Sequence, residues 1–505
     1  MNAPRESSIP NRQSSIPNRQ SPIPNPQSAF RRPVREILIV VALTLLATSL
    51  RLWQLDAPSL WGDELGTIHN ALSSDLFYSK MLGYLPTRIG LNVQGLGPDV
   101  LPADGYEVWR ERGLDERAAR LPSCLIGIVT IPLIYLATRQ ILPVPASTLA
   151  SLFLCLSHWH ILWSQTARFY SLQFLFYSLG LIFYYQATRN GYVRSWSLAV
   201  AMAVLAVLSQ PTAAVIFLVF GADLLVRRIT GEIPRFPKVP LIVGFALLAA
   251  LCALLFRDVR SNPEQWLRFF QGPNQPPFRL FASTAFYVQP PMIAAALGSA
   301  WWLHRQRDRL GIFLLLAGVI PALAFSIVGL FAFVEARYCL ISLYPWLLLA
   351  SVGCMSIWKH MGRGGRQALS FIPILALASS QLVSLLGYYT EGGYRSRVRE
   401  ALEYVAARIQ PDDQVCAHRL EGAYYLKRPI EIDSHDIRKV ADTIDRRTWI
   451  VCGASNHGSP PRRWFQGRAD LLATFDTYLV GPSESVQVYL IDPAIKGDSR
   501  DHAPP

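Results

Sequence analysis

Residues 36–53 read EILIVVALTLLATSLRLW, an apolar run in which Glu36 near the start and Arg51 near the end are the charged residues. A helix of about 20 such residues crosses the roughly 30 Å hydrocarbon core of a bilayer. Runs of similar length recur along the 505-residue chain, which is 51% hydrophobic and 16% charged, whereas soluble proteins average about 25% charged. The sequence therefore predicts that most of the chain lies in a membrane.

Eleven apolar runs are predicted to be membrane helices, at residues 36–53, 119–141, 146–163, 171–187, 196–208, 212–226, 239–256, 281–303, 310–333, 339–358 and 368–388. Ser209, Gln210 and Pro211 separate two of these runs, which we interpret as two short helices because about 30 apolar residues are long for one crossing. With the N-terminus inside, the inner loops carry twice as many lysines and arginines as the short outer loops, as the positive-inside rule requires. The net charge of +13 is therefore interpreted as a topology signal and not as a nucleic-acid surface.

The N-terminal segment 1–35 contains a repeated heptapeptide, with SSIPNRQ at 7–13 and 14–20 and SPIPNPQ at 21–27. A segment so rich in Pro, Ser, Asn and Gln buries too little apolar surface to fold. Its positive start is followed by prolines and not by the apolar region of a signal peptide. We therefore expect residues 1–35 to form a disordered tail on the inner side.

Two longer regions are predicted to face outward. The first, 54–117, is acidic, and its segment ELGTIHNAL at 64–72 places Leu65, Ile68 and Leu72 on one side of a helix. This pattern is typical of amphipathic helices that lie along a membrane.

The second outer region, 391–495, has the composition of a soluble domain. Apolar residues recur at helical spacing in RVREALEYVAARI (397–409), while DQVCAHR (413–419), TWIVCGA (448–454) and VQVYLID (486–492) have the pattern of strands. We therefore predict a small α/β domain, followed by a disordered tail at 496–505. Cys416 and Cys452 fall in two of the strands, and the sequence leaves open whether they form a disulfide or stay as buried thiols.

The segment LWGDELG at 60–66 places Asp63 and Glu64 at the start of the acidic loop. A carboxylate at the mouth of a membrane cavity can take the proton of an attacking hydroxyl group. An aspartate in front of ELGTIHNAL also suits the N-cap of a helix, and a divalent cation is a further ligand that such side chains hold. His158 and His160 are two residues apart, a spacing that favours packing over metal binding on a helix. The residues alone leave the cap, the base and the cation open.

Two arginines are predicted in short outer loops among aromatic residues, Arg168 two positions before Tyr170 and Arg337 directly before Tyr338. A guanidinium at the membrane interface is unfavourable unless it is paired, and a phosphate group fits its geometry. For Arg337 the alternatives are an ion pair with Glu335 or a side chain that extends to the membrane surface. We interpret both arginines as candidates for binding a phosphate group.

Four stretches resemble, in the same order, successive motifs of the membrane glycosyltransferases of the GT-C fold: RLWQLDAPSLWGDE (51–64), ERAARLPSCLIG (116–127), LSHWHILWSQTARFYSL (156–172) and ARYCLISLYPWLLL (336–349). This superfamily includes the protein O-mannosyltransferases and the aminoarabinose lipid A transferases. The resemblance covers roughly residues 36–390. It implies a polytopic α-helical GT-C domain over that range, with the active-site carboxylate in loop 54–117 and the α/β domain in the periplasm.

The resemblance also implies an activity. Such enzymes take one sugar from a polyprenyl-phosphate carrier and pass it, with inversion, to a hydroxyl or phosphate group of a periplasmic glycolipid, lipopolysaccharide or protein. The family's acidic pair falls on Asp63 and Glu64, which implies that Asp63 is the general base with Glu64 in support. Its arginine and tyrosine motifs fall on four residues that are expected to contact the carrier phosphate: Arg168, Tyr170, Arg337 and Tyr338. The implied location is a bacterial inner membrane, with the N-terminus in the cytoplasm.

Two features depart from the family. Many relatives have Gln-Glu-Ala-Arg where this chain has Gln165-Thr166-Ala167-Arg168, and many have a His-Pro-Pro-Leu-Tyr run that loop 54–117 does not contain. The rivals to an enzyme are a transporter or flippase of lipid-linked saccharides and a scaffold of a polysaccharide assembly complex. Transporters often show internal repeats and charged residues near the midplane of the membrane. The apolar runs of this sequence show neither feature, which disfavours a transporter or flippase.

Overall fold

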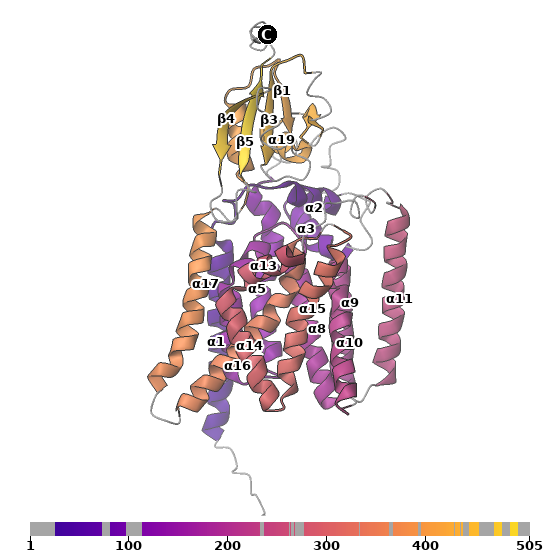
Figure 1. Cartoon of the computed structure of the whole chain (residues 1–505), viewed down its shortest axis with the longest axis vertical. Helices are drawn as coiled ribbons and strands as arrows, with labels where there is room; N and C mark the ends of the chain where they lie inside the picture. Colours follow the sequence, from indigo (N-terminus) through magenta and orange to yellow (C-terminus); the bar gives the residue numbers. More distant parts are fainter. Residues whose placement is uncertain are drawn as a thin grey trace, which may run out of the picture.

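The computed structural model shows a bundle of long helices beneath a small α/β domain that the C-terminal part of the chain forms (Figure 1). The described residues are 26–72, 81–96, 114–232, 237–261, 263, 267, 277–332, 334–362, 367–391, 395–428, 430–434, 436–437, 444–453, 469–476 and 485–492. We refer to the end of the bundle beneath the α/β domain as the domain end, and to the opposite end as the far end.

Each predicted membrane helix has a helical counterpart at the same place in the chain. The bundle contains α1 (Pro26–Leu52), α5 (Glu116–Thr138), α6 (Val144–Leu156), α7 (His158–Ser164), α8 (Tyr170–Asn190), α9 (Val193–Ser209), η3 (Pro211–Ala214), α10 (Val215–Ile229), α11 (Lys238–Ser261), α13 (Pro277–Val288), α14 (Pro290–Arg305), α15 (Arg309–Val328), η4 (Ala336–Ser342), α16 (Leu343–Gly362), η5 (Gln367–Phe371) and α17 (Ile372–Thr390). The aromatic-rich core of the bundle is formed mainly by α6, α8, α9, α15 and α16.

Not every helix of the bundle is long and apolar enough to cross a membrane by itself. Within the described residues, four helical units are long and apolar enough to cross a membrane: Glu116–Thr138, Arg309–Val328, Ala336–Met361 and Ala368–Thr390. The bent pair of α13 and α14 makes a fifth if it counts as one span. The chain is a multi-pass membrane protein, and the total of eleven crossings stays a prediction.

Two of the predicted helices are broken. The run 146–163 divides into α6 and α7 at Ser157, whose backbone is extended and whose hydroxyl accepts a hydrogen bond from the N–H of His160 (3.4 Å). The run 281–303 divides at Gln289, where φ is 78° and the axes of α13 and α14 differ by 92°. The hydropathy of the sequence does not reveal such breaks, because the segments on both sides of each break are apolar.

Helix α1 begins earlier than predicted. It starts at Pro26, so the prediction of a disordered tail is wrong for residues 26–35, which continue the first membrane helix. Residues 1–25, which hold most of the heptapeptide repeat, lie outside the described residues.

The chain reverses direction between α9 and α10. Arg189 at the end of α8 and Arg227 near the end of α10 line one pocket at the far end, together with Arg309 at the start of α15. Helices α9 and α10 therefore run in opposite directions, as two separate helices on either side of Pro211 require. The shared pocket also brings these arginines to one end of the bundle, in agreement with the predicted distribution of charge.

The long loop after α1 forms α2 (Gly62–Leu72) and α3 (Met81–Val93) at the domain end (Figure 1). Leu65, Ile68 and Leu72 are buried on one side of α2, as their spacing predicted. They pack in one apolar cluster with Leu402 and Trp449 of the C-terminal domain. The apolar face of α2 is thus covered by protein and not by lipid, whereas the position of this helix along the membrane stays a prediction. The sequence identified the apolar face but not its partner.

The C-terminal domain packs helices α18 (Val398–Ala406) and α19 (Arg419–Leu426) against a mixed sheet. Its strands are β1 (Gln414–Ala417), β2 (Ile432–Asp433), β3 (Thr448–Gly453), β4 (Asp470–Phe475) and β5 (Val486–Ile491), in the order β2-β1-β3-β5-β4. Strand β1 is parallel to β2 and β3, whereas β5 is antiparallel to β3 and β4. The three predicted strands correspond to β1, β3 and β5.

Cys416 in β1 and Cys452 in β3 are buried free thiols, so the disulfide that the sequence left open is not formed. Burial raises the pKa of Cys452 to about 12, which keeps this thiol protonated at neutral pH. The predicted tail 496–505 lies outside the described residues.

Candidate active site

The site is built on the first turn of α2. The carbonyl of Trp61 accepts a hydrogen bond from the N–H of Glu64 (2.9 Å), and the N–H of Gly62 donates to Oε1 of Glu421 (2.6 Å) in the C-terminal domain. The carboxylate at the start of this helix is therefore that of Glu421, while Asp63 lies inside the first turn. This arrangement leaves the Asp63 side chain to interact elsewhere.

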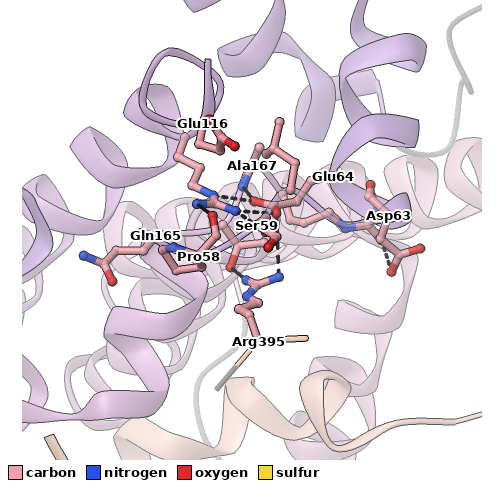
Figure 2. A network of polar contacts seen from close by, with 12 residues as sticks. Pro58, Ser59, Asp63, Glu64, Glu116, Gln165, Ala167 and Arg395 are labelled. Carbon is pink, nitrogen blue, oxygen red and sulfur yellow. Dashed lines mark hydrogen bonds and ion pairs between the residues drawn. The ribbon is translucent and has the colours of Figure 1, made fainter. Parts of the chain in front are cut away.

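Glu64 is enclosed by protein. Its two oxygens each lie 2.9 Å from the guanidinium of Arg120, and both side chains are fully buried. The N–H of Ala167 donates to Oε1 (2.7 Å), and Arg395 lies 3.7 Å from Oε2 (Figure 2). Burial alone would raise the pKa of Glu64, but the two guanidinium groups hold it below its ordinary value of 4.5. A buried, doubly paired carboxylate has no access to an acceptor, which argues against the predicted catalytic role of Glu64.

Arg120 fixes the chain in front of α2. It lies near the start of α5, a helix that Asp115 caps by accepting from the N–H of Ala118 (2.6 Å). Besides Glu64, its guanidinium donates at 2.8–3.1 Å to three carbonyls of the preceding loop, those of Leu55, Pro58 and Ser59. One buried guanidinium therefore holds both the loop and the helix that carry the site.

Asp63 points away from this buried pair (Figure 2). Its side chain is 36% exposed, and Oδ2 lies 2.6 Å from Nη1 of Arg337 and 3.5 Å from Nη2 of Arg168. Arg168 also donates to the Asp63 carbonyl and to Oγ1 of Thr67, both at 2.8 Å. An accessible carboxylate thus lies between two guanidinium groups that come from distant parts of the chain.

Aromatic rings flank both arginines. The guanidinium of Arg168 lies 5.8 Å from the ring centroid of Tyr170, and that of Arg337 lies 5.7 Å from the ring of Tyr338 and 5.4 Å from that of Trp61. Such distances allow cation–π attraction, which helps to hold a cation in a partly apolar site. The structure thus brings together five of the six predicted site residues, and Glu64 is the one that lies apart.

A cavity of about 430 Å³ lies between the bundle and the C-terminal domain next to Arg337. Trp61, Trp163 and Arg337 line it from the bundle, and His418 and Glu421 line it from the C-terminal domain. Asp63 adjoins the cavity through its ion pair with Arg337. A polar and aromatic cavity of this volume suits a sugar-sized ligand.

The family model for dolichyl-phosphate-mannose-protein mannosyltransferases matches residues 112–256. The fold is similar to the crystal structure of ArnT from Cupriavidus metallidurans in the apo state, with a TM-score of 0.56 and 14% identity over 91% of this chain and 98% of that chain. The same ArnT bound to undecaprenyl phosphate gives a TM-score of 0.54 at 14% identity, over 89% of this chain and 97% of that chain. No curated protein sequence matches the chain.

The archaeal oligosaccharyltransferase AglB from Archaeoglobus fulgidus, in complex with an inhibitory peptide and a dolichol-phosphate, is also similar. Its TM-score is 0.53 at 11% identity, over 83% of this chain and 69% of that chain. The chain has the GT-C fold. The resemblance that the four sequence motifs indicated is therefore confirmed at the level of the fold.

In this GT-C chain, Thr166 occupies the position where the motif of many relatives has glutamate. Its hydroxyl donates to the carbonyl of Leu162 (2.6 Å) and accepts from Nη2 of Arg395. Arg395 in turn faces Glu64 and stacks 5.2 Å from the ring of Trp61. The departure at Thr166 therefore lies in the buried network around Glu64, and not beside Asp63.

The two histidines of α7 have packing roles in the GT-C bundle. The ring of His158 stacks on Tyr287 at 5.8 Å, and Nδ1 of His160 lies 2.7 Å from Nη2 of the buried Arg51. In the described part of the chain, no group of three or more His, Cys, Asp or Glu side chains is arranged to hold a metal ion. The Asp63 carboxylate pairs with Arg337 and Arg168, and a divalent cation at this residue stays a prediction.

Sequence reasoning missed four residues of the site: Arg120, Arg395, His418 and Glu421. Arg120 lies within the motif ERAARLPSCLIG (116–127). Its position directly after the acidic loop could therefore have identified it as a partner for a carboxylate of that loop. The other three lie in the C-terminal region, far from α2 in sequence, and their contacts with α2 depend on how that domain docks.

Proposed function

We propose that this protein is an inverting glycosyltransferase that moves a single sugar from a polyprenyl-phosphate carrier to an acceptor at the outer face of a bacterial inner membrane. The observation that carries the proposal is the partly exposed carboxylate of Asp63 between Arg337 (2.6 Å) and Arg168 (3.5 Å) beside a cavity. A base next to two cations suits a reaction in which a hydroxyl group loses a proton while a phosphate leaves. Similarity to folds whose structures hold undecaprenyl phosphate and dolichol-phosphate supports this class of donor.

The proposed reaction is a single nucleophilic displacement at the anomeric carbon of the sugar. The acceptor oxygen attacks the anomeric carbon as its proton passes to a carboxylate oxygen of Asp63. The bond between that carbon and the phosphate oxygen breaks, and the polyprenyl phosphate takes the electron pair. Arg168 and Arg337 stabilise the phosphate, and a general acid is unnecessary because this leaving group is already a weak base.

The free protein holds Asp63 in an ion pair that donor binding is expected to loosen. Arg337 lies within 2.7 Å of both Asp63 and Glu335, and a guanidinium has five N–H donors that can serve two anions. A donor phosphate competes with the two carboxylates for this guanidinium. Binding of the donor thereby frees an Asp63 oxygen for the acceptor, so the donor is expected to bind before the acceptor.

The other predicted residues take supporting roles in this proposal. Tyr170 and Tyr338 lie beside the arginines, where they orient the guanidinium planes and offer hydroxyl groups to the phosphate. Glu64 holds the frame of the loop through Arg120 and is no longer proposed to act on substrate. Periplasmic glycolipids, lipopolysaccharide and protein hydroxyl groups remain the candidate acceptors.

Reconstitution tests the proposal. The purified protein is mixed with radiolabelled polyprenyl-phosphate sugars and extracted membrane acceptors, and transfer is compared between wild type and Asp63→Asn. Loss of a general base lowers the rate by about 100-fold or more, so Asp63→Asn should retain about 1% of activity. Glu335→Gln is the matched control, because it also removes a carboxylate paired with Arg337.

The outcomes separate the competing functions. Equal transfer by wild type and Asp63→Asn would refute the base assignment. Carrier binding without transfer from any donor would favour the transporter or flippase, and neither binding nor transfer would favour the scaffold.

A further inference from the structure

The first turn of α2 is held by the C-terminal domain at the residue that precedes Asp63. Glu421 lies in the first turn of α19, and its Oε1 accepts from the N–H of Gly62 at 2.6 Å. The start of a helix has unsatisfied N–H groups and a partial positive charge, which a carboxylate stabilises. In most helices this group comes from the preceding residue, but here it comes from a residue that is 359 positions away in sequence.

A second side chain of the same domain packs on this turn. A Cβ atom at Gly62 would lie 2.6 Å from Cε1 and 3.1 Å from Nε2 of His418. Carbon atoms do not approach so closely, so a larger residue at position 62 would require the ring of His418 to move away from the backbone. Gly62 therefore allows the ring of His418 to rest against the backbone beside Asp63.

The surrounding contacts make this arrangement rigid. The N–H of Leu60 donates to the hydroxyl of Tyr425 (2.7 Å), and that hydroxyl also bonds to Glu116 (3.0 Å) at the start of α5. Arg399 reaches the same Glu116 carboxylate at 3.0 Å. Beneath these polar contacts, the apolar side of α2 shares one core with α18 and α19. The segment before Asp63 is thus fixed on two sides by the C-terminal domain.

We propose that Glu421 and His418 are positioning residues that hold the first turn of α2 and so keep Asp63 paired with Arg337 at the edge of the cavity. This inference rests on the proposed function of Asp63 and adds that the bundle alone does not complete the site. Because Asp63 follows Gly62 directly, loss of the Glu421 contact frees the turn that carries the carboxylate. A misplacement of about 1 Å can lower a rate by about 100-fold even when the chemistry is otherwise intact.

Variants of the full-length protein test this proposal in two ways. In the transfer assay, Glu421→Ala and Gly62→Ala are expected to lower kcat by about tenfold or more, with little change in the KM for the donor. Glu421→Gln keeps an oxygen that accepts from Gly62, so it should retain most of the activity. The double variant Gly62→Ala/His418→Ala should recover the activity of His418→Ala alone, because the smaller side chain makes room for the new methyl group.

Amide hydrogen exchange of residues 60–66 provides a readout that does not depend on activity. Exchange in this segment should rise in Glu421→Ala and stay near the wild-type rate in Glu421→Gln. Glu400→Ala is the matched control, since it removes a carboxylate of α18 that pairs with Arg397 on the surface. It should change neither exchange at 60–66 nor kcat.

Unchanged exchange and unchanged kcat in Glu421→Ala and Gly62→Ala would overturn the positioning role. Failure of the double variant to recover activity would overturn the contact between His418 and Gly62. If wild type transfers no sugar, the proposed function fails while the exchange data still decide whether α19 holds this turn. If Glu421→Ala unfolds, Glu421→Gln and the Gly62 and His418 variants show whether the C-terminal domain positions the first turn of α2.

Discussion

At the scale of the residue, Asp63 and Glu64 show how one position along a helix separates an accessible carboxylate from a structural one. Adjacent side chains on an α-helix diverge by about 100°, so Asp63 and Glu64 point into different surroundings. The sequence predicted that this pair matters but not which member is enclosed. That choice depends on Arg120 and Arg395, whose approach is set by tertiary packing and not by local pattern.

The buried pair of Glu64 and Arg120 predicts a large loss of stability when one partner is removed. In Glu64→Ala the guanidinium of Arg120 would stay buried without its counter-charge, because both side chains are fully enclosed. Breaking such a pair destabilises a protein by about 3–5 kcal/mol. We expect a clear decrease in the Tm of the detergent-solubilised protein, measured by the fluorescence of its tryptophans.

Glu400→Ala is the control for this measurement, because it removes an exposed partner of Arg397. Exposed ion pairs contribute about 0–1 kcal/mol, so its Tm should stay close to that of wild type. A Glu64→Ala protein as stable as the control would show that the pair is not what holds the loop in front of α2.

At the level of helices and strands, the hydrophobic runs predicted where helices lie but not where they break. The break at Ser157 separates α6 from α7, and the bend at Gln289 separates α13 from α14. Each break lies inside a run that is apolar on both sides, so hydropathy alone cannot reveal it. The acidic loop had an identifiable apolar face on α2, but the strands and helices that cover it belong to a domain more than 300 residues away.

The contact between α14 and α16 predicts that a single glycine controls their separation. A Cβ atom at Gly353 would lie 1.8 Å from Oγ of Ser299, and it would still lie 3.0 Å from the Cβ of Ser299 if that hydroxyl rotated away. Small residues let membrane helices approach closely, and overpacking such a contact destabilises a protein by about 1–3 kcal/mol. We therefore expect Gly353→Val to lower the Tm.

Gly298 on α14 offers a matched position, because nothing lies within 4 Å of a Cβ atom added there. Gly298→Ala should leave the Tm unchanged or raise it slightly, since alanine favours a helix. Equal Tm values for Gly353→Val and Gly298→Ala would contradict the close approach of α14 and α16.

At the scale of the whole molecule, the bundle and the C-terminal domain form one unit around the candidate site. The cavity has walls from both, and the core beneath α2 is continuous with that of the α/β domain. The sequence could predict each part, because hydropathy separates membrane helices from a soluble domain. The sequence could not predict how the bundle and the C-terminal domain pack together, because the residues in contact lie more than 300 positions apart in the chain.

The distribution of charge predicts how this unit is oriented in the membrane. Arginines of α8, α10 and α15 gather at the far end of the bundle, and the positive-inside rule places such an end in the cytoplasm. Single cysteines at two exposed positions, Arg408→Cys in the C-terminal domain and Gln306→Cys at the far end, can be probed with a maleimide that does not cross membranes. The background is a Cys252→Ser protein, because Cys252 is exposed while the other six cysteines are buried. In intact spheroplasts, Arg408→Cys should be labelled, whereas Gln306→Cys should be labelled only after the membrane is permeabilised; the reverse pattern would place the candidate site on the cytoplasmic side and exclude a periplasmic acceptor.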